Sequence, residues 1–143
     1  MALVKQFATF YLDRLLFGVE VGKVQEVIRY QEMTRVPLAP SVVTGLINLR
    51  GQIVAALDLR RRLELTERAA DRLPMNVVVR AGDEAVSLLV DEIGDVLEVE
   101  DESFEPPPET LKGVAHELIR GAYKLKDRLL LVLDTEKAVS IPA

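Results

Sequence analysis

Three pairs of short apolar segments constrain the fold of this chain most strongly, because only two or three residues separate the members of each pair. Linkers of that length join neighbouring antiparallel strands, so each pair predicts a β-hairpin. Many short strands with turns between them favour a barrel or a sandwich over a parallel sheet. The predicted hairpins comprise residues 4–12 and 15–21 around Asp13-Arg14, residues 77–81 and 85–90 around 82–84, and residues 119–125 and 129–133 around 126–128.

Residues 44–63, TGLINLRGQIVAALDLRRRL, predict a strand, a turn and a second strand followed by a short helix. Asp58 suits the N-cap of that helix, because its carboxylate would accept backbone N–H groups of the first turn. Arg50 is the unusual residue, since it is a charged side chain at a tight turn near Gly45 and Gly51, which allow another backbone to approach. This arrangement indicates docking and not catalysis. A second short helix is expected after Asp134.

Two segments of the chain are repeated in weak form. IVAALDLR at 53–60 is similar to LLLVLDTE at 129–136, and VGKVQEV at 21–27 is similar to VDEIGDV at 90–96. Either the similarity arises by chance, because strand–Asp–helix units are common, or the chain contains two similar barrels side by side. In the second case, residues 1–143 form one domain, with a first barrel at about 1–70 and a second at about 71–143. The boundary is expected near residues 67–73, ahead of Pro74, with possible exchange of strands or helices between the halves.

Composition narrows the functional classes. Hydrophobic residues make up 49% of the 143 residues and aromatic residues 5%, so the chain is able to bury a core that is mainly aliphatic. The formal net charge of −5 argues against nucleic-acid binding, which needs a basic surface. The sequence has no cysteine and no apolar run of the roughly 20 residues that span a bilayer. Since the N-terminus also lacks the pattern of a secretory signal, we expect a cytoplasmic protein without direct membrane insertion.

The sequence contains no recognisable pattern for catalysis. The GxSxG elbow of hydrolases and the phosphate-binding patterns GxGxxG and GxxxxGK[ST] are absent. His116 is the single histidine, and without cysteine it is weak evidence for a metal site. We therefore expect no enzyme, no cofactor and no metal.

Residues 45–63 resemble the signature of the CheW family, the coupling proteins of bacterial chemotaxis. The resemblance continues through FGVEVGKVQEVIRYQEMTRVPLAP at 17–40, VSLLVDEIGDVLEV at 86–99 and LIRGAYKLKDRLLLVLD at 118–134, and so covers nearly the whole chain. Ala55 is a departure, because the family usually has a proline there. Alanine is tolerated inside a strand, so this difference concerns local rigidity and not the assignment.

The resemblance implies a mainly β fold of two SH3-like, five-stranded barrel subdomains, with short helices, a shared hydrophobic seam and a groove between the barrels. It also implies a non-enzymatic adaptor that couples transmembrane chemoreceptors to the histidine kinase CheA and supports assembly of the receptor–kinase array. The expected partners are the cytoplasmic tip of a chemoreceptor, a methyl-accepting chemotaxis protein, and the regulatory domain of the kinase.

The same resemblance implies two sets of contact residues. Those expected to bind the receptor are Val24, Glu26, Val27, Gly45, Asn48, Arg50 and Gly51. Those expected to bind the kinase or to form an array contact are Pro107, Pro108 and Thr110. Structural alternatives stay open for both sets: a solvated turn arginine, valines that fill the core, glycines needed only for turn geometry, and a solvated proline-rich loop. The run Arg60-Arg61-Arg62 is interpreted as a solvated helix face.

Two other functions stay open. The nearer is a coupling domain of another receptor–kinase pathway, such as surface motility or second-messenger control. A fused receiver domain, as in the related CheV proteins, is not expected because the chain ends at Ala143. The other is a small β-barrel enzyme or ligand-binding protein, which a deep polar pocket would support.

Overall fold

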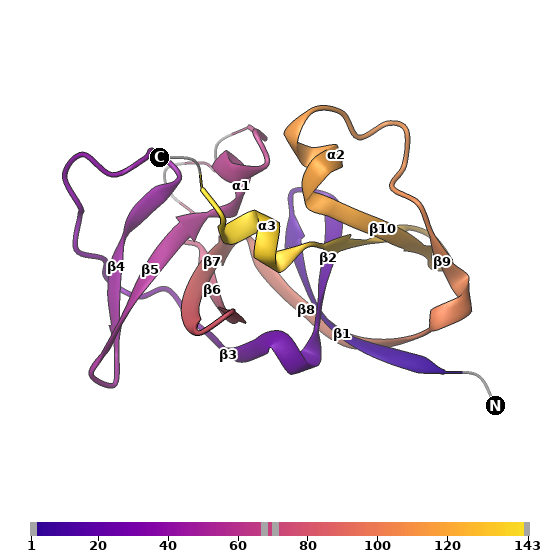
Figure 1. The fold of residues 1–143 in the computed structure, drawn as a ribbon, viewed down its shortest axis with the longest axis horizontal. Helices are drawn as coiled ribbons and strands as arrows, with labels where there is room; N and C mark the ends of the chain where they lie inside the picture. Colours follow the sequence, from indigo (N-terminus) through magenta and orange to yellow (C-terminus); the bar gives the residue numbers. More distant parts are fainter. Residues whose placement is uncertain (1–2, 67–68, 70–71, 142–143) are drawn as a thin grey trace.

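The computed structural model describes residues 3–66, 69 and 72–141, which form two β-sheets with short helices (Figure 1). The six-stranded sheet has the order β8-β1-β2-β11-β10-β9 and the five-stranded sheet the order β3-β6-β7-β5-β4. The six-stranded sheet consists of β1 (Val4–Leu12), β2 (Leu15–Glu20), β8 (Glu92–Glu100), β9 (Phe104–Glu105), β10 (Ile119–Lys124) and β11 (Leu129–Leu133). The five-stranded sheet consists of β3 (Val24–Ile28), β4 (Val43–Leu49), β5 (Gln52–Asp58), β6 (Met75–Ala81) and β7 (Glu84–Val90).

The predicted mainly β architecture of two subdomains is confirmed, as are the three predicted hairpins β1–β2, β6–β7 and β10–β11. One sheet has the expected five strands, whereas the other gains a sixth because the short strand β9 pairs with β10. The helical turns are η1 (Val21–Lys23), α1 (Leu59–Arg62), η2 (Asp101–Ser103), α2 (Val114–Leu118) and α3 (Thr135–Val139).

Both aspartates that we expected to start helices do so. The carboxylate of Asp58 accepts the backbone N–H of Arg60 at 3.0 Å, at the start of α1. The carboxylate of Asp134 accepts the backbone N–H of Lys137 at 3.1 Å, at the start of α3. Each bond satisfies a donor that the first helical turn would otherwise leave without a partner.

The two sheets share one topology. In each sheet, an edge strand pairs with the first strand of a hairpin, and the second strand of that hairpin runs parallel to a strand of another hairpin. The parallel pair is β2 with β11 in the six-stranded sheet and β7 with β5 in the five-stranded sheet. Hairpin β1–β2 is in the same sheet as the later strands β8–β11, and hairpin β6–β7 is in the same sheet as the earlier strands β3–β5. Strand exchange between the halves is therefore present, and each sheet contains strands from both sides of the expected boundary. Residues 67–68 and 70–71 of that boundary segment lie outside the described residues.

The internal repeat is a property of the fold and not a chance similarity. Strands β4 and β5 and helix α1 correspond to strands β10 and β11 and helix α3. Two residues correspond when one lies as far along the chain from Asp58 as the other lies from Asp134. The register of β4 against β5 shifts between Val43 and Gly45, and that of β10 against β11 shifts between Ile119 and Gly121, which are corresponding positions. The two units thus share even the place of their strand irregularity.

A continuous hydrophobic seam joins the two sheets, as expected. One buried cluster contains Phe10 and Phe17 of the six-stranded sheet, whose rings stack at 5.8 Å, together with Val79 and Leu88 of the five-stranded sheet. Helix α3 lies between the sheets in Figure 1 and contributes the fully buried Ala138 to this cluster. Because burial of apolar area is the main favourable term in folding, this shared cluster makes the two sheets one unit.

Strand β5 is regular through Ala55, which pairs with Leu46 of β4 and Val86 of β7. Alanine in place of the proline expected at this position therefore does not interrupt the strand before Asp58. Within the described part of the chain, no helix reaches the length and apolar content needed to cross a bilayer.

Candidate functional site

The β4–β5 turn has the geometry that presents a side chain to a partner. Leu49 pairs with Gln52, so Arg50 and Gly51 are the only turn residues, and their φ angles are 49° and 89°. Two positive φ angles in a two-residue loop are those of a type I′ turn, whose twist matches a right-handed hairpin. The side chain of Asn48 supports the turn, because its Oδ1 accepts the backbone N–H of Gly51 at 2.9 Å. A Cβ on Gly51 would meet open space, so its φ is what requires glycine.

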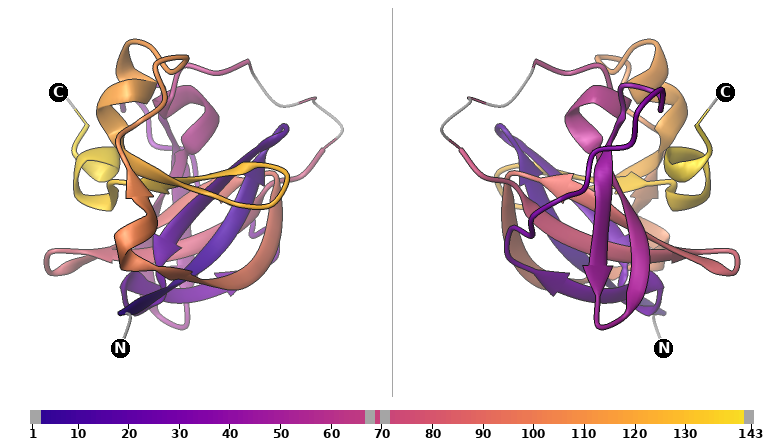
Figure 2. Two further views of the ribbon diagram at one scale, coloured as in Figure 1. Left: turned by 90° about the vertical axis from the view of Figure 1, so that its right-hand side faces the viewer. Right: turned by 90° about the vertical axis from the view of Figure 1, so that its left-hand side faces the viewer.

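Arg50 pairs with Glu26, and this brings two of the predicted receptor contacts together. The ion pair links the β4–β5 turn to β3, which lies at the opposite edge of the five-stranded sheet from β4. The Arg50 side chain is 77% exposed and that of Glu26 18% exposed. The carboxylate thus holds one end of the guanidinium while most of the arginine stays open to solvent, so the hairpin carries an oriented cation at its tip. Figure 2 shows the backbone of the two sheets from both sides.

The two valines of β3 differ in exposure. Val24 is half-buried and packs against the shared cluster, so it fills core space as well as bordering the surface. Val27 is 40% exposed. Val27 is therefore the more accessible of the two valines, and it lies on the opposite face of β3 from Glu26.

Gly45 lies inside β4 and not at the turn, which corrects our expectation. It is buried, and a Cβ there would lie 2.7 Å from the carbonyl oxygen of Thr34 and 2.9 Å from Cβ of Met33. Thr34 and Leu46 exchange two backbone hydrogen bonds of 2.8 Å, which places residues 33–34 against this strand. The close backbone approach that we expected from a partner is therefore made by the protein's own chain.

The second predicted set lies in the loop between β9 and α2. Pro108 and Thr110 line a cavity of about 200 Å³ together with Arg14 and Leu15 of the β1–β2 hairpin and Leu129 of β11. We call this cavity the Thr110 groove. Pro107 is half-buried beside it and does not line it. The two predicted surfaces thus lie on different sheets, the Arg50 tip on the five-stranded sheet and the Thr110 groove on the six-stranded sheet.

Arg60 is buried, so the interpretation of the arginine run as a solvated helix face is wrong at this residue. Only 4% of its side chain is exposed, and its Nε donates to Asp91 Oδ1 at 2.9 Å while Nη2 also pairs with the second oxygen of that carboxylate. The same guanidinium donates to Asp13 at 2.7 Å and to the carbonyl of Thr66 at 2.8 Å. The hydrogen bond to Asp91 raises the pKa of Arg60 above its ordinary value, although burial opposes this, so the group stays charged.

The other two arginines of the run also hold backbone carbonyls. Arg61 donates to the carbonyl of Ser41 at 2.9 Å, next to the loop before β4. Arg62 donates to the carbonyls of Ala138, Lys137 and Ser140 at 2.8, 2.9 and 3.1 Å. Those carbonyls lie at the C-terminal end of α3, where a cation is favoured. No local pattern in the sequence signals these side-chain contacts, because, apart from the Thr66 carbonyl, the partners named above for the three arginine side chains are distant along the chain.

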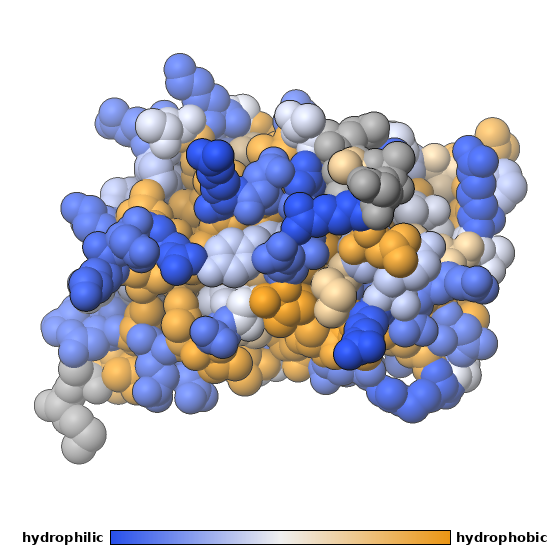
Figure 3. Space-filling model, turned by 180° about the vertical axis from the view of Figure 1, so that it is seen from behind, coloured by the Kyte–Doolittle hydropathy of each residue, from blue (hydrophilic) through white to orange (hydrophobic). Residues whose placement is uncertain are grey.

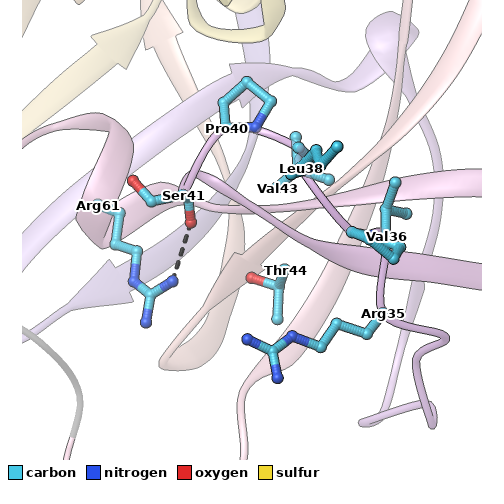
Figure 4. Close-up of a pocket in the computed structure, with 10 residues that line it drawn as sticks. Arg35, Val36, Leu38, Pro40, Ser41, Val43, Thr44 and Arg61 are labelled. Carbon is cyan, nitrogen blue, oxygen red and sulfur yellow. Dashed lines mark hydrogen bonds between the residues drawn. The ribbon is translucent and has the colours of Figure 1, made fainter.

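A further concavity of about 670 Å³ lies along the loop of residues 35–41, with Thr44 and Arg61 on its other side (Figure 4). Leu38 at its rim is fully exposed and has a φ of 65°. Seen from behind, the space-filling view shows hydrophobic residues around the middle of the molecule, bordered by hydrophilic residues (Figure 3).

Among the described residues, no group of three or more His, Cys, Asp or Glu side chains is arranged to hold a metal ion. His116 is exposed on α2. What the structure does bring together is a set of surfaces suited to binding other proteins.

The comparison with known families agrees with this character. The family model of the CheW-like domain matches residues 6–142 of this chain. The chain belongs to the CheW family. The match confirms the family resemblance that we inferred from residues 45–63. Because the match spans residues 6–142, it also confirms that the resemblance covers nearly the whole chain.

Named CheW proteins are similar over most of their length. The chemotaxis protein CheW of Klebsiella aerogenes is 33% identical over 136 residues, which cover 95% of this chain and 82% of that one. The chemotaxis protein CheW of Treponema pallidum is 30% identical over 139 residues, covering 94% and 82%. The crystal structure of the scaffolding protein CheW from Thermoanaerobacter tengcongensis superposes with a TM-score of 0.87 at 25% identity, covering 97% of this chain and 94% of that chain.

Proposed function

We propose that this protein is a non-enzymatic chemotaxis adaptor that couples chemoreceptors to the histidine kinase CheA. Membership of the CheW family supports it, since the similar proteins are named as chemotaxis and scaffolding proteins. The observation that carries it is the separation of two candidate surfaces on two sheets of one rigid, shared core. An adaptor has to bind two partners at once, and surfaces on different sheets allow this.

The Arg50 tip binds the cytoplasmic tip of the receptor, a helical hairpin. The exposed arginine held by Glu26 gives a charged contact, and Val27, on the other face of the same edge strand, gives a separate apolar contact for a helix that packs against this edge. Arginine is enriched among the residues whose truncation costs about 2 kcal/mol or more at interfaces. Asn48 and Gly51 contribute by fixing the turn, and Gly45 by allowing residues 33–34 to pack on β4.

The Thr110 groove binds the regulatory domain of the kinase. Its walls combine the aliphatic side chains of Leu15 and Leu129 with Arg14 and the proline-rich loop. Proline fixes φ in the unbound loop, so less conformational entropy is lost when a partner binds. Pro107 supports this loop from beside the groove.

The adaptor works in the cytoplasm by making contacts whose free energy differs between receptor signalling states. It biases the kinase only as far as those contacts differ, because coupling cannot exceed the differential binding free energy. We expect each interface to be of modest size and affinity, so that simultaneous binding in an array supplies much of the overall affinity.

A bridging assay tests this function. Immobilised kinase lacking its phosphotransfer domain should capture a soluble receptor signalling fragment only when this protein is added. Thr110→Arg changes an exposed residue and should abolish capture by weakening kinase binding, with receptor binding unchanged when measured alone. Absence of bridging by the wild-type protein, despite an intact thermal melt, would contradict the adaptor function.

A further inference from the structure

A single buried arginine connects the two sheets through a polar cluster. Arg60 lies in α1, which follows the five-stranded sheet, whereas Asp13 lies in the β1–β2 turn of the six-stranded sheet. Asp91 lies between them, where the chain passes from β7 of one sheet to β8 of the other, and its side chain is 2% exposed. We call these three residues the Arg60 cluster.

The β1–β2 turn depends on this cluster for its conformation. Asp13 has a φ of 54°, which is unfavourable for most side chains. In the corresponding β6–β7 turn, the same first position is occupied by Gly82 with a φ of 60°. Asp13 therefore adopts a backbone geometry that glycine would adopt more easily, and the group that glycine would lack is its carboxylate.

Both polar groups of Asp13 are used inside the cluster. Its backbone N–H donates to Asp91 Oδ2 at 2.8 Å, and its carboxylate accepts from Arg60 at 2.7 Å. The planar guanidinium donates to both carboxylates at once, a geometry that a lysine ammonium does not reproduce. The turn is thus held at a fixed position relative to α1.

The residues that follow Asp13 form one wall of the Thr110 groove. Arg14 and Leu15 line it opposite Pro108 and Thr110. Asp13 does not line the groove. A shift of the turn would move Arg14 and Leu15, and so would change the width of the groove without altering any residue that contacts a partner.

We propose that Arg60 and Asp13 are positioning residues that set the shape of the Thr110 groove for its protein partner. This inference rests on the proposed function, in which that partner is the regulatory domain of the kinase. The receptor-binding Arg50 tip does not depend on the cluster, because its turn is held by Asn48 and Glu26.

Asp13→Gly separates positioning from simple stability. It relieves the positive φ and removes the carboxylate, whose side chain is 55% exposed, while Arg60 keeps its buried bond to Asp91. We expect about tenfold weaker binding of the kinase domain, from loss of one charge-assisted hydrogen bond, with an unchanged melting temperature and unchanged binding of a receptor fragment. Asp83→Ala in the β6–β7 turn is the matched control, since it removes one exposed carboxylate from the corresponding hairpin and should change neither affinity.

A double-mutant cycle and amide hydrogen exchange complete the test. Combined with Arg60→Lys, Asp13→Gly should add much less than it does alone, because both act through one contact. In the free protein, Asp13→Gly should speed exchange of the Arg14 and Leu15 amides and leave the β4–β5 hairpin unchanged. Kinase affinity equal to wild type, or unchanged exchange in the turn, would overturn the inference. If the wild type itself fails to bind the kinase domain, the proposed function fails, and the exchange data alone then decide whether the cluster positions the turn.

Discussion

The unit formed by β4, β5 and α1 and the unit formed by β10, β11 and α3 share their buried design and differ at their surfaces. Both end in an aspartate that caps a short helix. Both contain a buried glycine, Gly45 or Gly121. A Cβ at Gly45 would clash with residues 33–34, and a Cβ at Gly121 would clash with β9. The repeated features are those that the fold needs, because they fix where the strand register shifts and let an extended segment pack against the strand.

The tips of the two hairpins are different. The first has the two-residue turn Arg50-Gly51 with positive φ angles, and Arg50 pairs across the sheet with Glu26. The second has a longer loop closed by a 2.8 Å bond from the Leu125 N–H to the Arg128 carbonyl. Lys126, the counterpart of Arg50, is exposed and forms no ion pair with any described residue. Under the proposed function, binding specificity would therefore reside in the tip and not in the shared frame.

The two helices also differ in how they are attached. Helix α1 supplies Arg60 to a buried cluster and Arg62 to the end of α3, whereas Glu136, the counterpart of Arg60, is exposed. The first unit therefore anchors the second. We expect the following substitutions to break or sharpen this asymmetry, in order of decreasing effect.

Asp91→Ala should have the largest effect on stability. It leaves the buried guanidinium of Arg60 without its main counter-charge, which costs about 3–5 kcal/mol of unfolding free energy. Urea unfolding measures this, with Glu92→Ala as control, because the ion pair of Glu92 with Arg72 is exposed and worth less than about 1 kcal/mol. Equal losses in the two variants would show that the buried cluster is not structural.

Gly121→Ala should be next. Its Cβ would overlap the Phe104 ring and the Glu105 carbonyl oxygen, so β9 has to move away, at about 1–3 kcal/mol. Gly45→Ala should cost a similar amount, since its neighbour is also a backbone carbonyl, that of Thr34. Gly22→Ala, where a Cβ meets nothing within 4 Å, is the control for both. A Gly121 variant as stable as the Gly22 variant would refute the packing argument.

Arg62→Ala should have a smaller effect, because its contacts are partly exposed. Loss of its bonds to the α3 carbonyls should cost about 1 kcal/mol and should speed hydrogen exchange in α3 without affecting α1. Lys137→Ala removes an exposed cation from α3 itself and should leave exchange nearly unchanged. Faster exchange in both helices would mean that Arg62 stabilises the whole protein and not α3 alone.

Arg50→Ala should affect stability least, by less than about 1 kcal/mol, because its ion pair with Glu26 is open to solvent at the arginine. The melting temperature should stay within a few degrees of the wild type. A larger drop would show that the main role of Arg50 is structural, through its ion pair between the β4–β5 turn and the opposite edge strand β3, and not binding.

Sequence reasoning predicted the local elements well because each has a local cause. Two-residue linkers such as Asp13-Arg14 specify hairpins, and Asp58 and Asp134 specify helix starts. The repeat at 53–60 and 129–136 also indicated the duplication, since it is carried by those same caps. Family resemblance supplied the function and the candidate contacts.

Features that depend on distant segments were specified poorly or not at all. Exchange of strands between the halves was allowed for, but the sequence did not show which hairpins exchange, because this depends on the edge that each strand meets and the two hairpins have similar patterns. Burial of Arg60 depends on Asp13 and Asp91, which no spacing rule connects to it. Gly45 was assigned to the turn because its contact with Thr34 is made across a long loop. The pairing of Arg50 with Glu26 was equally invisible, although both residues were candidates.

The most direct test of the central claim compares Arg50→Glu with Lys126→Glu in a titration against a receptor signalling fragment. The two substitutions reverse the same charge at corresponding positions of the two hairpin tips. We predict that Arg50→Glu weakens receptor binding about 30-fold or more, as expected for an interface anchor, while Lys126→Glu binds like the wild type. Equal weakening by both, or wild-type binding by Arg50→Glu, would contradict the assignment of the receptor surface to the first tip.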